Sequence, residues 1–146
     1  MNYASRLERF LAFIIDNFLL RLVAEILLLV GGDHSAVALL GAFACLVVYN
    51  VLTVASNWQA TPGQHLMRLR VIRRDGRLLN ERDALERFLA FIIPFLPMYL
   101  SIAPLEVLSM ATVWLMMAWF MPILLRDDRA GVHDVLCGTL VVKVPR

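Results

Sequence analysis

The sequence predicts an all-α membrane protein with four transmembrane helices and a small cytoplasmic β-hairpin or sheet. Hydrophobic residues make up 60% of the 146 residues and charged residues 18%, whereas soluble domains average roughly 45–50% and about 25%. The mean hydropathy is +0.72, and the apolar residues gather in four runs near the roughly 20 residues that cross a bilayer. A chain of this length fits one domain, which we assign to residues 1–146.

The four apolar runs are predicted to span the membrane at residues 10–30, 36–56, 88–103 and 105–125. Lys and Arg gather in the N-terminal segment, in the loop 57–87 and in the tail 126–146, whereas the connections at 31–35 and around Pro104 carry neither. Under the positive-inside rule, both termini and the loop lie in the cytoplasm. Four spans satisfy this arrangement because an even number of helices separates each pair of basic segments.

The third span contains prolines that interrupt its hydrogen bonding. Pro94 and Pro97 lack the N–H groups that would bond to the carbonyls of Ala90 and Ile93. Membrane helices tolerate such prolines where neighbouring groups satisfy the freed carbonyls. We therefore expect a kinked helix over this run.

The loop 57–87 contains a pattern typical of β-structure. Met67–Ile72 alternates apolar and basic residues, and Asp75-Gly76 is a turn signal. Arg77–Leu79 would then run back beside the first strand. This order predicts a β-hairpin. Thr139–Val144 is rich in β-branched residues and could add a third strand.

The first span carries three charges, Asp16, Arg21 and Glu25. Each charge costs roughly 2.5–3.5 kcal/mol at the centre of a membrane helix, so the three together cancel or exceed the gain from the apolar residues. Arg21 and Glu25 are four residues apart and are predicted to form a structural ion pair. Asp16 has no basic residue three or four positions away, and pairing with Arg9, about 10 Å away along the axis, would be stretched. We therefore expect its partner on another segment. The role of Asp16 stays open between structural anchor and ion or proton site.

The nine residues LERFLAFII occur twice, at 7–15 and at 85–93, at the start of the first and third spans. A duplicated helix pair would relate the two halves by an axis along the membrane normal. Arg9 would then correspond to Arg87, and Asp16 would lie at the depth of Pro94. The alternative is that both segments need the same type of helix start at the cytoplasmic interface. The residues favour neither interpretation over the other.

Three segments in order resemble the RDD family of bacterial membrane proteins. They are RFLAFIID at 9–16, Thr61-Pro62-Gly63 followed by Leu69-Arg70-Val71, and Gly131–Asp134 followed by Gly138-Thr139. Gln64 and Arg68 depart from the Lys and Gly common in this family. The resemblance implies that Arg9, Asp16 and Asp134 are the name-giving arginine and aspartates. It also implies a multi-pass protein of the bacterial inner membrane, with transport the usual proposal and sodium–proton exchange suggested for some members.

Two hypotheses follow for function. The first is a small transporter that exchanges a monovalent cation for a proton at a cluster of Arg9, Asp16 and Asp134, with His133 as a further candidate. The second is a membrane scaffold, or a lipid- or protein-binding module, whose basic loop contacts lipid headgroups through Arg73, Arg74 and Arg77. His133 and Asp134 fit either a helix cap or a proton-handling pair. A homo-oligomer fits the first hypothesis because four helices leave little room for a pathway.

Other classes of function find no motif in the sequence. Metal-ligand and hydrolase motifs are absent, so we expect no enzyme, no metal and no cofactor. Stacking aromatic residues do not alternate with the loop arginines, which argues against nucleic acid as a partner. The expected partners are membrane lipids and, for an exchanger, a cation and a proton.

Overall fold

The computed structural model of the chain describes residues 2–31, 36–99 and 105–145. Helices account for most of these residues, and two short strands form one antiparallel sheet. The elements in order are α1 (Arg6–Gly31), α2 (Ala36–Ala55), α3 (Pro62–Leu66), β1 (Leu69–Arg73), α4 (Glu81–Ile92), the 3-10 helix η1 (Ile93–Tyr99), α5 (Leu105–Phe120), α6 (Pro122–Leu125), α7 (Val132–Leu136) and β2 (Thr139–Lys143).

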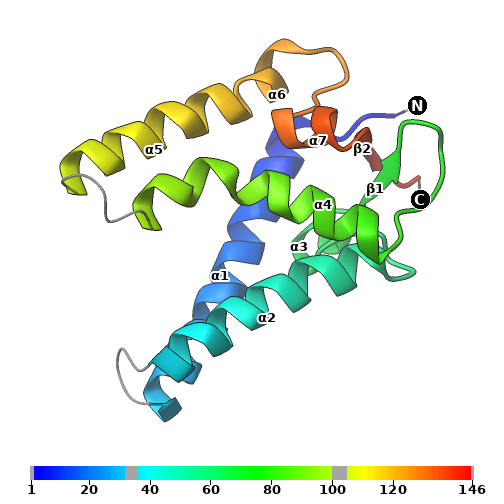
Figure 1. The fold of residues 1–146 in the computed structure, drawn as a ribbon. Helices are drawn as coiled ribbons and strands as arrows, with labels where there is room; N and C mark the ends of the chain where they lie inside the picture. The colour runs from blue at the N-terminus through cyan, green and yellow to red at the C-terminus, as the bar shows by residue number, and fades with distance from the viewer. Residues whose placement is uncertain (1, 32–35, 100–104, 146) are drawn as a thin grey trace.

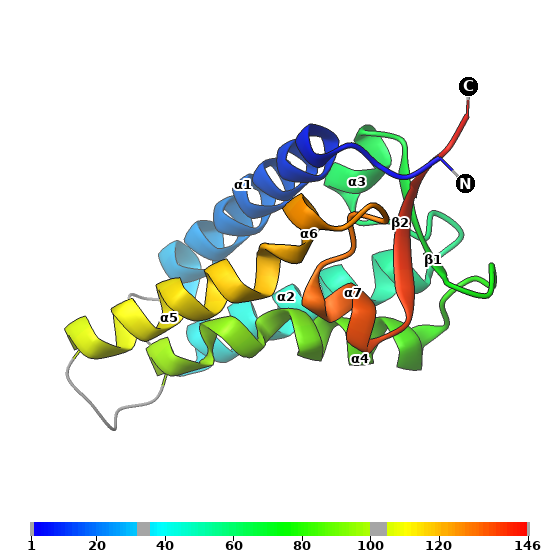
Figure 2. The same cartoon turned by 90° about the horizontal axis from the view of Figure 1, so that it is seen from above.

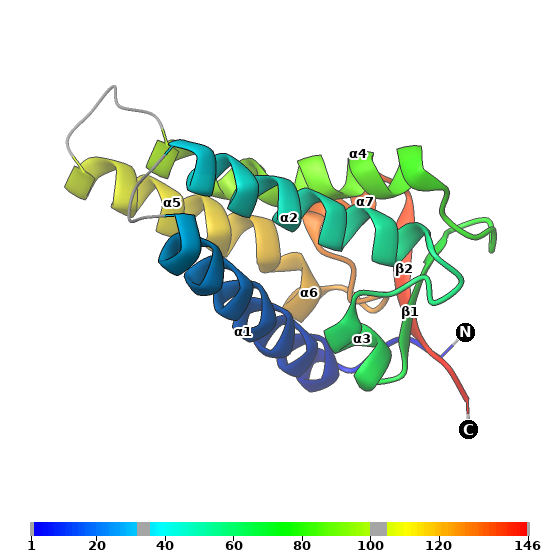
Figure 3. The same ribbon diagram turned by 90° about the horizontal axis from the view of Figure 1, so that it is seen from below.

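The long helices extend from one end of the molecule, where the short elements gather. In Figure 1, α1 and α2 form one arm, and η1 and α5 form a second arm that diverges from it. Figures 2 and 3 place the sheet, α3, α7 and both chain ends together at the end where the arms meet. We call this the sheet end. The buried core cluster lies there, with Leu69, Val71 and Val141 among its members.

The predicted spans correspond to helices with shifted bounds. The runs 10–30 and 36–56 match α1 and α2, whereas the run 88–103 begins within α4, which starts at Glu81, and continues into η1. The helix changes to the 3-10 type at Ile93, next to the buried Pro94, where we expected a kink. The run 105–125 is divided between α5 and α6. Residues 32–35 and the connection around Pro104 lie outside the described ranges.

None of the helices in the described ranges combines the length and the hydropathy needed to cross a membrane.

The predicted hairpin is wrong, although its turn exists. Arg77 O accepts from Arg73 N at 2.9 Å, and Gly76 has a φ of +85°. The returning segment does not become a strand, because Leu79 N and O bond instead to the buried side chain of Gln59. β1 pairs with β2, from the tail. The residues expected as a third strand therefore form the second strand of a two-stranded sheet.

The two halves of the described chain contain matching short elements. Each has a five-residue helix, then a residue with positive φ (Arg68 at 56°, Gly138 at 61°), then a five-residue strand. The strands pair symmetrically about Val71 and Val141. Before β1 in the chain, α1 packs against α3. Before β2, α4 packs against α7 in the same way. The helices that share LERFLAFII thus hold equivalent positions around this sheet.

Candidate functional site

Asp134 binds an arginine from each copy of the repeated segment. Arg9 on α1 donates from one guanidinium nitrogen to Asp134 Oδ2, and Arg87 Nη2 on α4 lies 2.6 Å from Asp134 Oδ1. Asp134 is fully buried, and each arginine side chain is only 10% exposed. Arg9 also donates to the carbonyl of Arg129, and Arg87 Nε to Thr139 Oγ1 at 3.3 Å. We call Arg9, Arg87 and Asp134 the charge triad.

The charge triad keeps Asp134 ionised. Burial alone would raise the pKa of this carboxyl, but the charges of His133, Arg87 and Arg9 outweigh burial and hold the pKa well below its usual range. At neutral pH the two arginines supply this attraction, because burial lowers the pKa of His133 to about 4, with the arginines acting in the same direction. His133 is therefore neutral while Asp134 is charged.

Asp134 also caps the start of α7, and His133 lies among aromatic rings. Gly131 N donates to Asp134 Oδ2 at 3.1 Å, which caps the helix. The ring of His133 lies edge-on to those of Phe91 and Phe120, at 5.6 and 5.8 Å between centroids. Its Nε2 lies 3.4 Å from Asp134 Oδ1. Both residues thus have clear packing and capping roles.

Asp16 binds a different set of groups from Asp134. Its Oδ1 accepts from the Tyr49 hydroxyl at 2.6 Å and from Gly63 N at 2.7 Å, and its Oδ2 accepts from Thr61 Oγ1 at 2.5 Å. These contacts join α1 to α2 and to the start of α3. A Cβ atom on Gly63 would lie 2.3 Å from Ala12 O and 2.8 Å from Asp16 Cγ. We call the hydrogen bonds of Asp16 with Tyr49, Thr61 and Gly63 the aspartate clamp.

The residues predicted as one cluster therefore form two sites. Arg9 and Asp134 meet with His133 beside them, whereas the hydrogen-bond partners of Asp16 come from α2 and α3. Sequence reasoning did not assign roles to Arg87 or Tyr49. The repeat indicated Arg87, because it aligns with Arg9. No comparable signal marked Tyr49, since an isolated tyrosine in an apolar run is ordinary.

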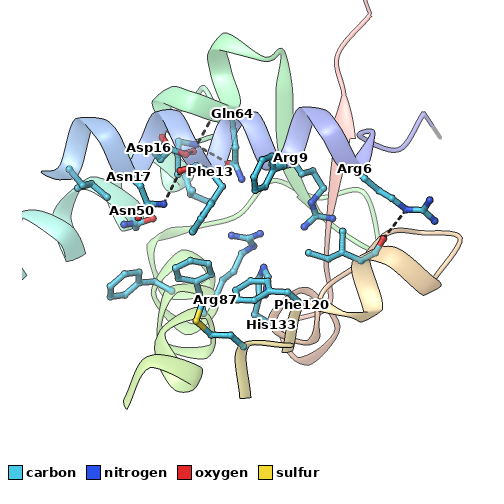
Figure 4. Close-up of a pocket in the computed structure, with 18 of the residues that line it drawn as sticks. Arg6, Arg9, Phe13, Asp16, Asn17, Asn50, Gln64, Arg87, Phe120 and His133 are labelled. Atoms are coloured by element: carbon cyan, nitrogen blue, oxygen red, sulfur yellow. Dashed lines mark hydrogen bonds between the residues drawn. The ribbon is translucent and has the colours of Figure 1, made fainter. Parts of the chain in front are cut away.

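A cavity of about 530 Å³ is lined mainly by residues of α1, α2, α4 and α5. Figure 4 shows Arg9, Arg87 and His133 around one part of it and Asp16, Asn17 and Asn50 around another. Most of the remaining lining is apolar, from Phe10, Phe13, Leu20, Leu46, Val54, Phe88, Phe91, Met116, Met117, Phe120 and Met121 among others. The volume falls within the usual range for small-molecule sites.

The other predicted charged residues lie outside this cavity. Arg21 Nε and Glu25 Oε1 are 3.6 Å apart, which matches the predicted pair, but both side chains are exposed. The loop arginines contact carboxylates: Arg73 with Asp83 at 2.5 Å, Arg74 with Asp128 at 2.8 Å and Arg77 with Asp75 at 2.7 Å. Lipid headgroups would have to compete with these contacts.

Comparison with known proteins identifies a family. A family model described as "RDD family" matches residues 3–138, which cover nearly the whole chain, including the charge triad residues and the aspartate clamp. No curated protein and no solved structure matches. The chain belongs to the RDD family, and this membership indicates a membrane protein without defining what it binds or moves.

Proposed function

We propose that the chain is a multi-pass protein of the bacterial inner membrane, with both termini in the cytoplasm. The family membership supports this, and so does the surface of the long helices. Large apolar side chains are exposed along each of them, for example Phe18 (68%) on α1, Leu40 (69%) on α2 and Trp114 (64%) on α5. An exposed apolar surface of this extent is unusual for a water-soluble monomer and typical of a surface that meets lipid or protein.

Reporter fusions test this orientation. Fusions after Ser35 and Pro104 should report the periplasm, and fusions after Arg74 and Arg146 should report the cytoplasm, because the sheet end carries the basic segments. Activity of a periplasmic reporter fused after Arg74 would contradict the four-span arrangement.

We further propose that the cavity binds an anionic amphiphile. The charged residues that line it are Arg6, Arg9, Arg87 and Asp16, so cations outnumber anions three to one. Asp134 lies behind this lining, and the arginines remain in excess even when its charge is counted. Arginine is well suited to phosphate and carboxylate groups, and the apolar remainder of the cavity would hold a hydrocarbon chain. This combination of a basic part with an apolar part is the observation that carries the proposal.

Native mass spectrometry of the purified protein tests the ligand class. Phosphatidylglycerol should bind about tenfold more tightly than phosphatidylcholine with the same acyl chains, and glycerol phosphate should bind weakly because it has no chain. Replacing Leu20, which lines the cavity, with Trp should abolish phosphatidylglycerol binding. Leu22→Trp, on the same helix but outside the lining, should not. Equal binding of both lipids, or unchanged binding to Leu20→Trp, would refute this assignment.

Cation–proton exchange at Asp16 is the second candidate function. The observation that favours it is that Asp16 borders the cavity together with the side-chain amides of Asn17, Asn50 and Gln64, whose oxygens suit a hard cation. The three donors to Asp16 argue for a structural role instead, because they already occupy both carboxylate oxygens.

Flux measurements in proteoliposomes separate the two roles of Asp16. An exchanger should lose proton-coupled cation flux in Asp16→Asn while the protein stays folded, and Asp16→Glu should keep part of the flux. A purely structural clamp should leave both variants similarly impaired in assembly. The matched control is Asp127→Asn, because Asp127 is an exposed carboxylate of the tail outside the cavity lining. Wild-type flux in folded Asp16→Asn protein would exclude exchange at this site.

A further inference from the structure

The ion pair of α1 is exposed at the middle of the helix. The Arg21 and Glu25 side chains are 83% and 62% exposed, and Arg21 Nε is 3.6 Å from Glu25 Oε1. Arg21 lies 15 residues after the start of α1, or roughly 22 Å along its axis. If α1 crosses the membrane, as proposed above, both charges lie deep in the hydrocarbon. Charges at this depth almost always face protein or water instead of lipid.

The exposed charges belong to a continuous face with the spacing of a helix–helix seam. Leu11, Ile14, Phe18, Arg21 and Glu25 follow one another at alternating intervals of three and four residues, and all five are exposed. This is the a/d spacing by which two parallel helices pack together. The face points away from Ala12 and Asp16, which lie against α3. The rest of the described chain therefore leaves it uncovered.

We propose that α1 packs along this face against α1 of a second copy of the chain, related by a two-fold axis along the membrane normal. The proposal rests on the membrane location proposed above. Arg21 of each copy would pair with the partner's Glu25 across the interface. A two-fold interface uses the same surface of both copies, and the four charges would then cancel.

Charge complementarity favours a second copy over other occupants. Each α1 face offers one cation and one anion one turn apart, so a copy of the same face supplies the matching pair. A lipid headgroup would satisfy only one of the two charges and lies at the membrane surface, far from Arg21. The flanking Leu11, Ile14 and Phe18 extend the contact with apolar side chains on both copies.

Charge exchange between two tagged copies tests this pairing. Arg21→Glu places four acidic groups at the interface of its homodimer, and Glu25→Arg places four basic groups there. When the two variants are co-expressed with different tags, the mixed dimer alone regains opposite charges across the interface. We expect the recovered amount of the mixed dimer to be about ten times that of either homodimer. Equal recovery of mixed and homodimers would overturn the proposal, because pairing within one helix gives no preference between copies.

Disulfide cross-linking in native membranes gives a second readout that does not depend on the charges. With Cys45 and Cys137 replaced by Ser, Phe18→Cys should cross-link two copies efficiently. Val48→Cys, a comparably exposed position on α2 (52%), should not. Similar yields at both positions would contradict the α1 interface. Carbonate extraction of the same membranes tests the location separately. A protein that stays in the membrane but is monomeric refutes only the dimer. A protein that is extracted refutes both the membrane location and the dimer.

Discussion

Replacing Asp134 with Asn is expected to produce the largest loss of stability of any conservative substitution at the sheet end. The variant would leave Arg9 and Arg87 buried without their shared counter-charge. Removal of one partner from a buried ion pair costs about 3–5 kcal/mol, because the remaining charge stays uncompensated. Thermal unfolding in detergent should show a much lower midpoint, or no folded protein at all.

Asp127 provides the matched control for this substitution. It lies in the same tail and is exposed, so Asp127→Asn should leave the unfolding midpoint nearly unchanged. An Asp134→Asn variant as stable as Asp127→Asn would show that Asp134 does not hold the two arginines.

The second large effect is expected at Gly63. A Cβ atom there would lie 2.3 Å from Ala12 O and 2.8 Å from Asp16 Cγ, so Gly63→Ala must push α3 away from α1 and disrupt the aspartate clamp. We expect a destabilisation at or above the upper end of the roughly 1–3 kcal/mol typical of overpacking, measured as a lower unfolding midpoint.

The control is Gly41→Ala within α2. Nothing lies within 4 Å of a Cβ atom built on Gly41, and alanine favours helix. This variant should be as stable as the wild type or more so. Equal midpoints for the Gly63 and Gly41 variants would mean that α3 does not approach α1 as closely as described.

The sequence predicted the helical architecture and part of the site because both depend on local patterns. The apolar runs indicated the long helices, and spacing along one helix indicated the Arg21–Glu25 pair. The repeated LERFLAFII segment also indicated the correspondence of Arg9 and Arg87, and the structure places both on Asp134. Together with the matching short elements, this is the symmetry that a duplicated helix pair would produce.

The remaining contacts depend on pairings distant in sequence. The Asp75-Gly76 turn formed as expected, but the side chain of Gln59 bonds to Leu79 and prevents the local hairpin, so β1 pairs with a strand from the tail. Spacing likewise could not show that Asp16 would find its donors on α2 and α3. Its distance from Arg9 along the helix did indicate a partner on another segment, which the contacts with Tyr49 and Thr61 confirm.

The most direct test of the charge triad is a double-mutant cycle on unfolding free energy. Arg9→Gln and Arg87→Gln should each be strongly destabilising in the wild-type background. Each should cost far less in Asp134→Asn protein, because the carboxylate that the arginine neutralises is already absent. The predicted result is a large coupling of both arginines to Asp134, measured on variants that remain folded enough to unfold cooperatively. Additive effects for either arginine would contradict the claim that one buried aspartate joins the two repeated helices.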